Sequence, residues 1–419
     1  MTDTLAAPSA TATPAAPGPL WRDVYILSGM RGLSFAGDIA AETAITLQLQ
    51  ARGAGSLAVM GLLLAASVPA VLLSPLTGKV ADRFDSRTLM VGVATLQALV
   101  CVAMVLWTSP AALIGLSVVL CAGLAFTHPV FGGLPSAMVG KANVPRASSI
   151  SQTTAMAGMV AAPGIAGILT GHFGVTLPLL IDAASFVVVA AGALAIRTRM
   201  HANRQAPAST SAPGTAAAAG PEQDYKVRSD RFLRSVLILS GAVMAAACII
   251  NVLIVFYVRQ TFGASETVYG IVVSAWMAGL VPGGMVVRRL KRLSHEWILI
   301  GSFVCIAVAI LGTGLAPGVW WIIPFYFLGG IGNGAQATVT HVLLNLRVPD
   351  THRGRAFAAL GAVSNTGPAI GFVVGGAALT VMAPRYGFIT AGVFALLAVL
   401  WFSNGVLKSA QPQAETSAG

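Results

Sequence analysis

Twelve long apolar segments constrain this chain more than any other feature of its sequence. A helix needs about 20 mainly apolar residues to cross roughly 30 Å of hydrocarbon, and each segment reaches about that length. The chain has 56% hydrophobic and only 9% charged residues, too little charge to cover a soluble protein of 419 residues. The sequence therefore predicts an all-α membrane protein with twelve transmembrane helices, at residues 22–50, 55–77, 88–108, 111–138, 148–171, 175–196, 233–258, 266–287, 297–315, 319–345, 355–381 and 386–407.

The positive charges between these segments fall mostly on one side of the membrane. With a cytoplasmic N-terminus, the outer loops hold only Arg52, Arg259 and Arg385, and the inner loops hold the remaining clusters of lysine and arginine. This distribution follows the positive-inside rule and predicts a multi-pass protein of the inner (plasma) membrane with both termini in the cytoplasm. The net charge of +11 then belongs to loops near anionic lipid headgroups, so it does not predict nucleic-acid binding.

A stretch rich in Pro, Ala, Ser and Gly at residues 197–232 divides the chain into two halves, residues 20–196 and 233–408. We expect this stretch to be a cytoplasmic linker between two six-helix bundles. Residues 1–19 are rich in Ala, Pro and Thr and lack the features of a signal peptide, so they predict a disordered cytoplasmic tail. Residues 409–419 are expected to form a second tail.

Short matches in the same order relate the two halves to each other. The letters ILSG occur at residues 26–29 and again at 238–241, and SLAVMG at 56–61 corresponds to SETVYG at 265–270. Because both halves cross the membrane six times, they are expected to be parallel, pseudo-symmetric repeats. Such a pair encloses a central path, and rocking one half against the other gives alternating access.

The segment GKVADRFDSR between the second and third spans resembles the signature G-x-x-x-D-R-x-G-x-R of the major facilitator superfamily. Gly78, Asp82, Arg83 and Arg87 match the signature, and Asp85 stands in place of its second glycine. The resemblance implies that Asp82 in this gating loop faces the start of the eleventh helix. The alternative interpretation of the same residues is an ordinary basic loop on the cytoplasmic side of the membrane.

The fifth span contains GMVAAPGIAG, which looks like the antiporter signature G-x-x-x-G-P-x-x-G-G of this superfamily. Alanines replace two of its glycines and still permit close helix contact. The alternative is a proline-kinked helix in which small residues serve packing alone. The matching residues are Gly158, Pro163, Gly164 and Gly167.

Four further stretches are similar to the twelve-span drug-efflux branch that includes macrolide and siderophore exporters. They read LSFAGDIA, LPSAMVGKANVPRASS, LIDAASF and VPDTHRGRAFA, and the resemblance extends over residues 20–408. It implies proton-coupled export of a small molecule. Many members of that branch carry an arginine in the fourth span, whereas this chain has none there and offers His128 instead.

Three charged residues lie inside the first span, where a charge near the bilayer centre costs about 2.5–3.5 kcal/mol. Arg31, Asp38 and Glu42 are seven and four residues apart, which places them within roughly 40° on one helix face. Either Arg31 and Asp38 form a structural ion pair with Glu42 near the outer water, or Asp38 or Glu42 titrates and binds in turn a proton and a cationic substrate. A carboxyl in a low-dielectric pocket suits a proton carrier.

Other polar residues within the spans are weaker candidates. Asp182 in the sixth span is expected to serve structural hydrogen bonding more than coupling, and His128 and His341 to pack within helices more than to relay protons. The C-terminal half has no acid at mid-membrane. Its amides and hydroxyls could face a substrate or join helices, and these residues are Asn251, Asn333, Gln336, Thr340 and Asn365.

The leading interpretation is a secondary active exporter of small amphipathic compounds, cationic or zwitterionic, that exchanges them for protons. The alternatives are a metabolite, sugar or siderophore transporter, and a membrane receptor or scaffold that no longer transports. No nucleophile with a base, metal cluster or phosphate loop is evident, so we expect no enzyme activity and no cofactor beyond the proton gradient. The expected partners are a small-molecule substrate, protons and the lipid bilayer, and the expected oligomeric state is a monomer.

Overall fold

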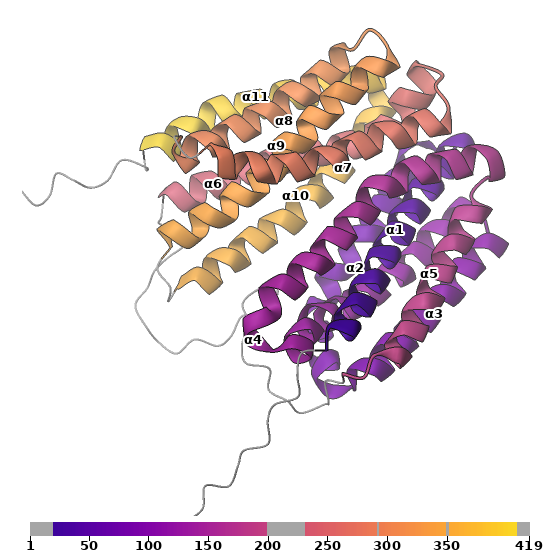
Figure 1. Cartoon of the computed structure of the whole chain (residues 1–419). Helices are drawn as coiled ribbons and strands as arrows, with labels where there is room; N and C mark the ends of the chain where they lie inside the picture. The colour runs from indigo at the N-terminus through magenta and orange to yellow at the C-terminus, as the bar shows by residue number, and fades with distance from the viewer. Residues whose placement is uncertain (1–19, 199–230, 291–292, 349–351, 409–419) are drawn as a thin grey trace, which may run out of the picture.

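The structure is a computed structural model that describes residues 20–198, 231–290, 293–348 and 352–408, and these residues are almost entirely helical (Figure 1). The expected tails and most of the expected linker lie outside the described residues. The helices are α1 (Trp21–Ala51), α2 (Gly55–Arg83), α3 (Ser86–Leu106), α4 (Pro110–Phe173), α5 (Thr176–Ala195), α6 (Arg231–Phe256), the π-helical η1 (Tyr257–Thr261), α7 (Glu266–Arg289), α8 (His295–Leu315), α9 (Val319–Arg347), α10 (Arg353–Val381) and α11 (Pro384–Lys408).

The helices lie close to the expected spans, with one difference in connection. The spans expected at 111–138 and 148–171 form one element, α4, which continues through the residues expected to be a loop. A break remains at Gly140, whose φ of +70° is a left-handed backbone conformation that glycine adopts without steric cost. The fourth and fifth spans are therefore joined by a sharp break and not by an open loop.

The described residues contain ten segments long and apolar enough to cross a membrane, fewer than the twelve expected. Two of these segments come from α4, on either side of Gly140. Helices α1 and α9 are not among the ten. The reason is chemical, because α1 carries Arg31, Asp38 and Glu42, and α9 carries a glycine-rich run with Asn333 and Gln336.

The helices of the first part of the chain pack together, and so do those of the second part (Figure 1). Within the first group, α4 packs against α1 and α2, and α5 packs against α1 and α3. Within the second group, α9 packs between α7 and α8, while α6 contacts α10 and α11. Exposed large apolar side chains such as Leu99, Val187 and Leu400 cover the outer surface, as expected for a face in contact with lipid.

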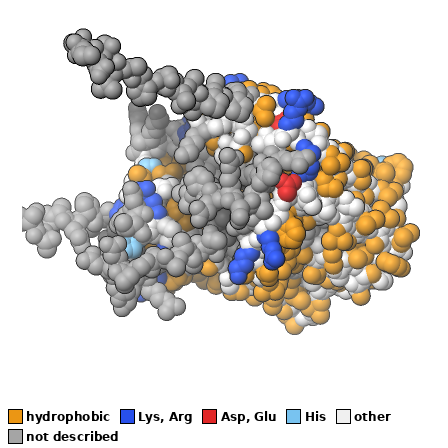
Figure 2. Space-filling model, turned by 90° about the horizontal axis from the view of Figure 1, so that it is seen from below, with side chains coloured by type: hydrophobic (Ala, Val, Ile, Leu, Met, Phe, Trp, Pro, Cys, Tyr) orange, Lys and Arg blue, Asp and Glu red, His pale blue; other side chains and the backbone are white. Residues whose placement is uncertain are grey.

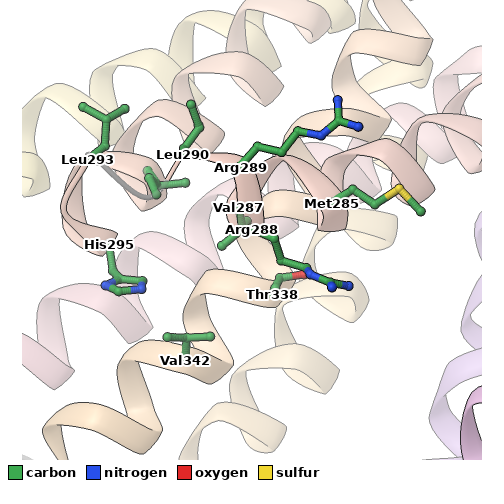
Figure 3. A pocket seen from close by; sticks show the side chains of 10 residues that line it. Met285, Val287, Arg288, Arg289, Leu290, Leu293, His295, Thr338 and Val342 are labelled. Atoms are coloured by element: carbon green, nitrogen blue, oxygen red, sulfur yellow. The ribbon is translucent and has the colours of Figure 1, made fainter. Parts of the chain in front are cut away.

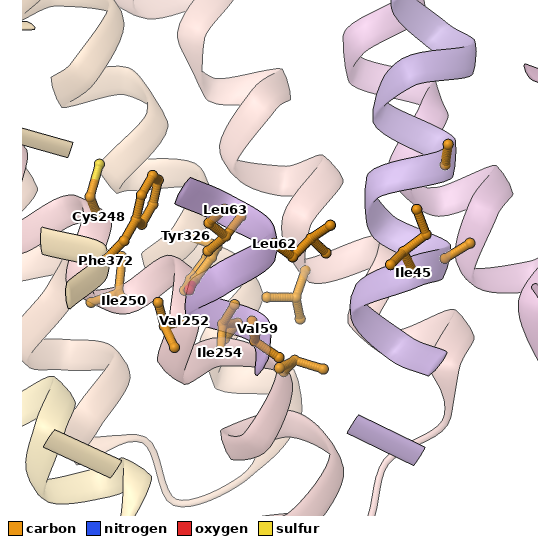
Figure 4. Packing of buried hydrophobic residues seen from close by; sticks show 14 of the residues in the cluster. Ile45, Val59, Leu62, Leu63, Cys248, Ile250, Val252, Ile254, Tyr326 and Phe372 are labelled. Atoms are coloured by element: carbon orange, nitrogen blue, oxygen red, sulfur yellow. The ribbon is translucent and has the colours of Figure 1, made fainter. Parts of the chain in front are cut away.

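The two groups meet through α4 with α7 and through α2 with α10. The Ser56 hydroxyl at the start of α2 donates a 2.8 Å hydrogen bond to the Gly376 carbonyl near the end of α10. Leu62 and Leu63 of α2 and Val252 of α6 belong to one apolar cluster that also includes Tyr326 of α9 (Figure 4). Towards the other end of α2, Leu72 and Leu76 are 68% and 51% exposed. The hydrogen bond from Ser56 and the close contact of Met60 with Gly376 therefore join the groups near the start of α2.

Figure 2 views the molecule from below and shows Lys and Arg side chains gathered on this face, beside a hydrophobic flank. Such a change from apolar to basic surface is typical of the boundary between membrane and water on the cytoplasmic side.

Candidate functional site

Helix α1 places its acidic residues on the side of the first group that approaches the second group. Asp38 and Glu42 are half-buried, one helical turn apart. The Oδ1 atom of Asp38 is buried and, among the described residues, has no hydrogen-bond partner. A buried carboxylate oxygen without a partner is unusual in a folded protein, because burying an unsatisfied polar group costs free energy. This oxygen is therefore available to a proton or a cation.

Asp182 of α5 joins Asp38 and Glu42 in one acidic cluster. Its side chain is fully buried, and its carboxylate interacts electrostatically with that of Asp38. Close approach depends on Gly37, because an added Cβ there would collide with Asp182 Oδ1. Asp182 accepts hydrogen bonds from Cys101 Sγ of α3 at 3.4 Å and from Ser185 Oγ at 3.3 Å. Neither the approach of Asp182 to Asp38 nor the role of Cys101 as a hydrogen-bond donor is visible in the sequence.

Arg31 does not form the ion pair with Asp38 that was one of the two expected arrangements. Its guanidinium lies over the Phe35 ring, 5.6 Å from the centroid, and donates a 3.4 Å hydrogen bond to Ser151 Oγ of α4. The physical reason is distance, because seven residues of helix span about 10 Å along the axis. His128 of α4 lies near the same group, 6.1 Å from the Phe35 centroid and close enough to Arg31 for an electrostatic interaction.

The acidic cluster lies next to the seam between the two groups. Glu42 lies near Tyr269 of α7, and Tyr269 lies near Tyr326 of α9. Tyr326 also stacks edge-on against Trp276, with 5.5 Å between ring centroids, and its hydroxyl is buried without a partner in the described chain. Tyr269 and Tyr326 thus extend the polar site into the second group. Tyr269 was not singled out from the sequence, because tyrosine in an apolar helix carries no distinctive pattern.

The antiporter-like residues of α4 contact two different helices. Gly158 packs on α1, where an added Cβ would lie 2.6 Å from the Gly32 carbonyl oxygen. Gly167 packs on α7, where an added Cβ would lie 2.5 Å from the Glu266 carbonyl oxygen. The Gly164 amide, next to Pro163, donates a 2.9 Å hydrogen bond to Ser274 Oγ of α7. Gly164 and Gly167 therefore contact the second group directly, whereas Gly158 packs within the first group, and Ser274 is a partner that the sequence did not indicate.

The gating-loop residues lie at the end of α2 and the start of α3. The side-chain surroundings of Gly78 and Asp82 lie outside what the structure describes, so the contact of Asp82 with the start of α10 stays a prediction. Arg83 is exposed, and Arg87 donates a hydrogen bond to the Ile196 carbonyl at the end of α5. Asp85, which departs from the signature, caps α3 by accepting a 3.2 Å hydrogen bond from the Arg87 amide.

The polar residues of the second group separate into two kinds. Gln336 and Thr340 are buried, and Gln336 Nε2 donates a 3.1 Å hydrogen bond to Thr340 Oγ1. Asn333 and Gln336 line a small cavity between α6, α8 and α9, with Ser240 on its wall. Asn251 and Asn365 are exposed, and His341 stacks on Phe357 at 5.6 Å. The described residues therefore bring together only Asn333, Gln336 and Thr340 of this set.

No group of three or more His, Cys, Asp or Glu side chains among the described residues could hold a metal ion. The site consists instead of carboxyl, thiol, hydroxyl and aromatic groups.

Comparison with known proteins identifies the kind of molecule that this arrangement belongs to. The sequence matches the profile of the transmembrane secretion effector family of major facilitator proteins over residues 21–418. It is 27% identical over 173 residues to the inner membrane metabolite transport protein YdjE of Escherichia coli (strain K12), which covers 41% of this chain and 36% of the relative. It is 23% identical over 331 residues to the uncharacterized MFS-type transporter YfiS of Bacillus subtilis (strain 168), which covers 75% of this chain and 76% of the relative.

Solved structures show the same fold. The nucleoside transporter NupG superposes with a TM-score of 0.71 at 14% identity, covering 91% of this chain and 98% of that one. A bacterial homologue of the iron transporter ferroportin, in an inward-facing state, superposes with a TM-score of 0.71 at 18% identity, covering 94% of this chain and 100% of that one. With a family profile that covers nearly the whole sequence and a transporter fold that covers nearly the whole structure, the chain belongs to the transmembrane secretion effector family of the major facilitator superfamily, whose members are membrane transporters and not enzymes.

Proposed function

We propose that this transporter exports a small amphipathic cation or zwitterion in exchange for protons, by alternating access between two six-helix halves. In this proposal α4 contributes two of twelve spans, and α1 and α9 cross the membrane although they are less apolar than the others. The proton gradient supplies the energy, and no cofactor takes part. The acidic cluster of Asp38, Glu42 and Asp182 binds either protons or the positive charge of the substrate.

The observation that carries the proposal is the unpartnered Oδ1 of Asp38, close to a second carboxylate on α5. Two carboxylates in a low-dielectric site repel each other when both are ionised, so the site favours one proton or one cation. Charged side chains within membrane spans are rare and mark ion or substrate pathways. The cluster also lies beside Tyr269 of the second group, so relative movement of the groups changes its surroundings.

Two further observations support the proposed direction and cycle. The family description is that of secretion, which favours export. The groups are sealed where Ser56 meets Gly376 and where Gly164 meets Ser274, and α2 is exposed towards its other end. With the basic face in the cytoplasm, this arrangement is an inward-open state.

A metabolite transporter is the second candidate. It rests on the match to a metabolite transport protein, which covers about a third of that relative. The acidic cluster would bind a metabolite that carries an amine as well as it would bind another organic cation. The charge of the substrate therefore does not distinguish the two candidate functions, whereas the identity of the substrate does.

The test uses the purified protein in sealed vesicles with an imposed proton gradient and a panel of fluorescent cationic dyes and amine-bearing metabolites. We expect uncoupler-sensitive substrate movement for the natural chain. Asp38→Asn should abolish accumulation against a gradient while facilitated exchange remains, and Glu42→Gln should shift its pH dependence.

Uphill transport at the natural rate by the Asp38→Asn, Glu42→Gln double variant, at equal membrane abundance, would rule out the proposed coupling role. Uncoupler-insensitive movement of every substrate by the natural chain would rule out proton antiport altogether.

A further inference from the structure

A groove separate from the acidic cluster lies at the basic end of the second group. It has a volume of about 810 Å³ and lies between the end of α7, the start of α8 and the surface of α9 (Figure 3). Its walls are mainly apolar, with Met285 and Leu290 on one side, Leu293 and Ile298 on another and Val342 at its base. The groove is therefore large and apolar enough to hold part of a hydrocarbon chain.

Two arginines and a histidine border this apolar groove. Arg288, Arg289 and His295 line it, and Figure 3 shows the Arg288 guanidinium beside Thr338. Among the described residues, neither arginine pairs with a carboxylate. The nearby acid, Glu296, is already held by Arg347 of α9 at 2.5 Å. The positive charges of the two arginines interact favourably with the negative end of the α7 helix dipole. This interaction does not occupy the N–H donors of their guanidinium groups.

The groove opens away from the path between the two groups. Thr338 and Val342 line it from the side of α9 that lies between α7 and α8. His341 is on a different side of α9 and stacks on Phe357 of α10. Met285 and Leu293 at the groove are 55% and 51% exposed, whereas Ile298 on its wall is buried. Because the groove lies on a different side of α9 from the contact with α10, its exposed apolar side chains face lipid and not the path between the groups.

We propose that this groove binds one anionic phospholipid of the cytoplasmic leaflet. The phosphate accepts charge-assisted hydrogen bonds from Arg288, Arg289 and His295, and an acyl chain lies along Met285, Ile298 and Val342. An arginine guanidinium suits a phosphate because its donors match the phosphate oxygens in pairs. Since the lipid contacts α7, α8 and α9 together, it would fix the inner end of α7, the helix that packs on α4 across the seam.

The test measures lipids retained by the purified full chain in native mass spectrometry, after equilibration with phosphatidylglycerol or phosphatidylcholine. We expect the natural chain to retain one phosphatidylglycerol in preference to phosphatidylcholine. The double variant Arg288→Gln, Arg289→Gln should weaken phosphatidylglycerol retention about tenfold or more. The matched control is Arg234→Gln, Arg355→Gln, which removes the same charge from exposed positions at the inner ends of α6 and α10 and should retain the lipid.

A second variant tests the groove itself without changing charge. Val342→Phe fills its base and should also displace phosphatidylglycerol, whereas Val308→Phe, at an exposed position further along α8, should not. Equal weakening by both arginine double variants would overturn the proposal, because it would indicate a diffuse surface charge. Full retention by Val342→Phe, or displacement of the lipid by inorganic phosphate alone, would also overturn it, because either result indicates an anion site without an acyl-chain groove.

Discussion

Single atoms decide how the acidic cluster is held together. Asp182 Oδ1 lies against the backbone of Gly37, while its carboxylate accepts hydrogen bonds from Cys101 and Ser185. Gly37 is next in sequence to Asp38, so this contact sets the separation of the two carboxyl groups. Gly37 therefore helps to determine the geometry of the acidic cluster, although it carries no charge itself.

Gly37→Ala should destabilise the protein and reduce transport. The added methyl would collide with Asp182 Oδ1 and lie 3.3 Å from Asp182 Cα, so backbone as well as side chain must shift. Such overpacking costs about 1–3 kcal/mol. Thermal unfolding in detergent measures the loss, with Gly29→Ala in the same helix as control, since a Cβ there meets nothing within 4 Å. An unchanged melting temperature in Gly37→Ala would show that α1 and α5 are not packed as described.

At the scale of helices, the close packing of α4 on α7 depends on glycines, which have no side chain to keep the two backbones apart. Gly167 and Gly270 let the two backbones approach, and the Gly164 amide reaches Ser274 Oγ. Small residues allow this kind of contact in membranes, where packing and hydrogen bonds drive helix association. The seam can therefore separate during a transport cycle without exposing large apolar side chains.

Gly167→Ala should loosen this seam selectively. Its methyl would lie 2.5 Å from the Glu266 carbonyl oxygen and 3.1 Å from Gly270 Cα, both backbone atoms that cannot rotate away. We expect faster hydrogen–deuterium exchange at the start of α7 and the end of α4. Gly171→Ala is the control, because its methyl would be at an ordinary contact distance of 3.6 Å from Glu266 Oε2. Identical exchange in both variants would contradict a steric role for Gly167.

At the scale of the whole molecule, the sealed end and the basic face lie at opposite ends of the helices. The seal is formed by residues near the start of α2 and the end of α10, and exposed Arg83 lies at the opposite end of α2. If basic loops are cytoplasmic, the structure is closed to the outside. The orientation of the protein in the membrane therefore determines whether this structure is closed to the outside or to the cytoplasm.

Cysteine accessibility measures this orientation. Ala383→Cys, in the exposed turn between α10 and α11, should react with a membrane-impermeant maleimide in intact cells. Phe84→Cys, in the turn between α2 and α3 and 50% exposed in the natural chain, should react only after the membrane is permeabilised. The natural chain, with two buried and two partly buried cysteines, provides the background. The reverse pattern would place the basic face outside.

The sequence by itself determined the elements, because hydropathy and helix length act locally along the chain. It predicted most helices to within a few residues. The exceptions are α2, which continues to Arg83 instead of ending at residue 77, and α4, because the left-handed Gly140 breaks a helix without a loop. It also identified Asp38 and Glu42, since charges stand out within an apolar helix. Only the tertiary structure decided their partners. That Asp182 approaches Asp38, that Arg31 donates to Ser151, and that Gly164 meets Ser274 depend on residues more than a hundred positions apart, whose contacts are set by helix packing and leave no local pattern.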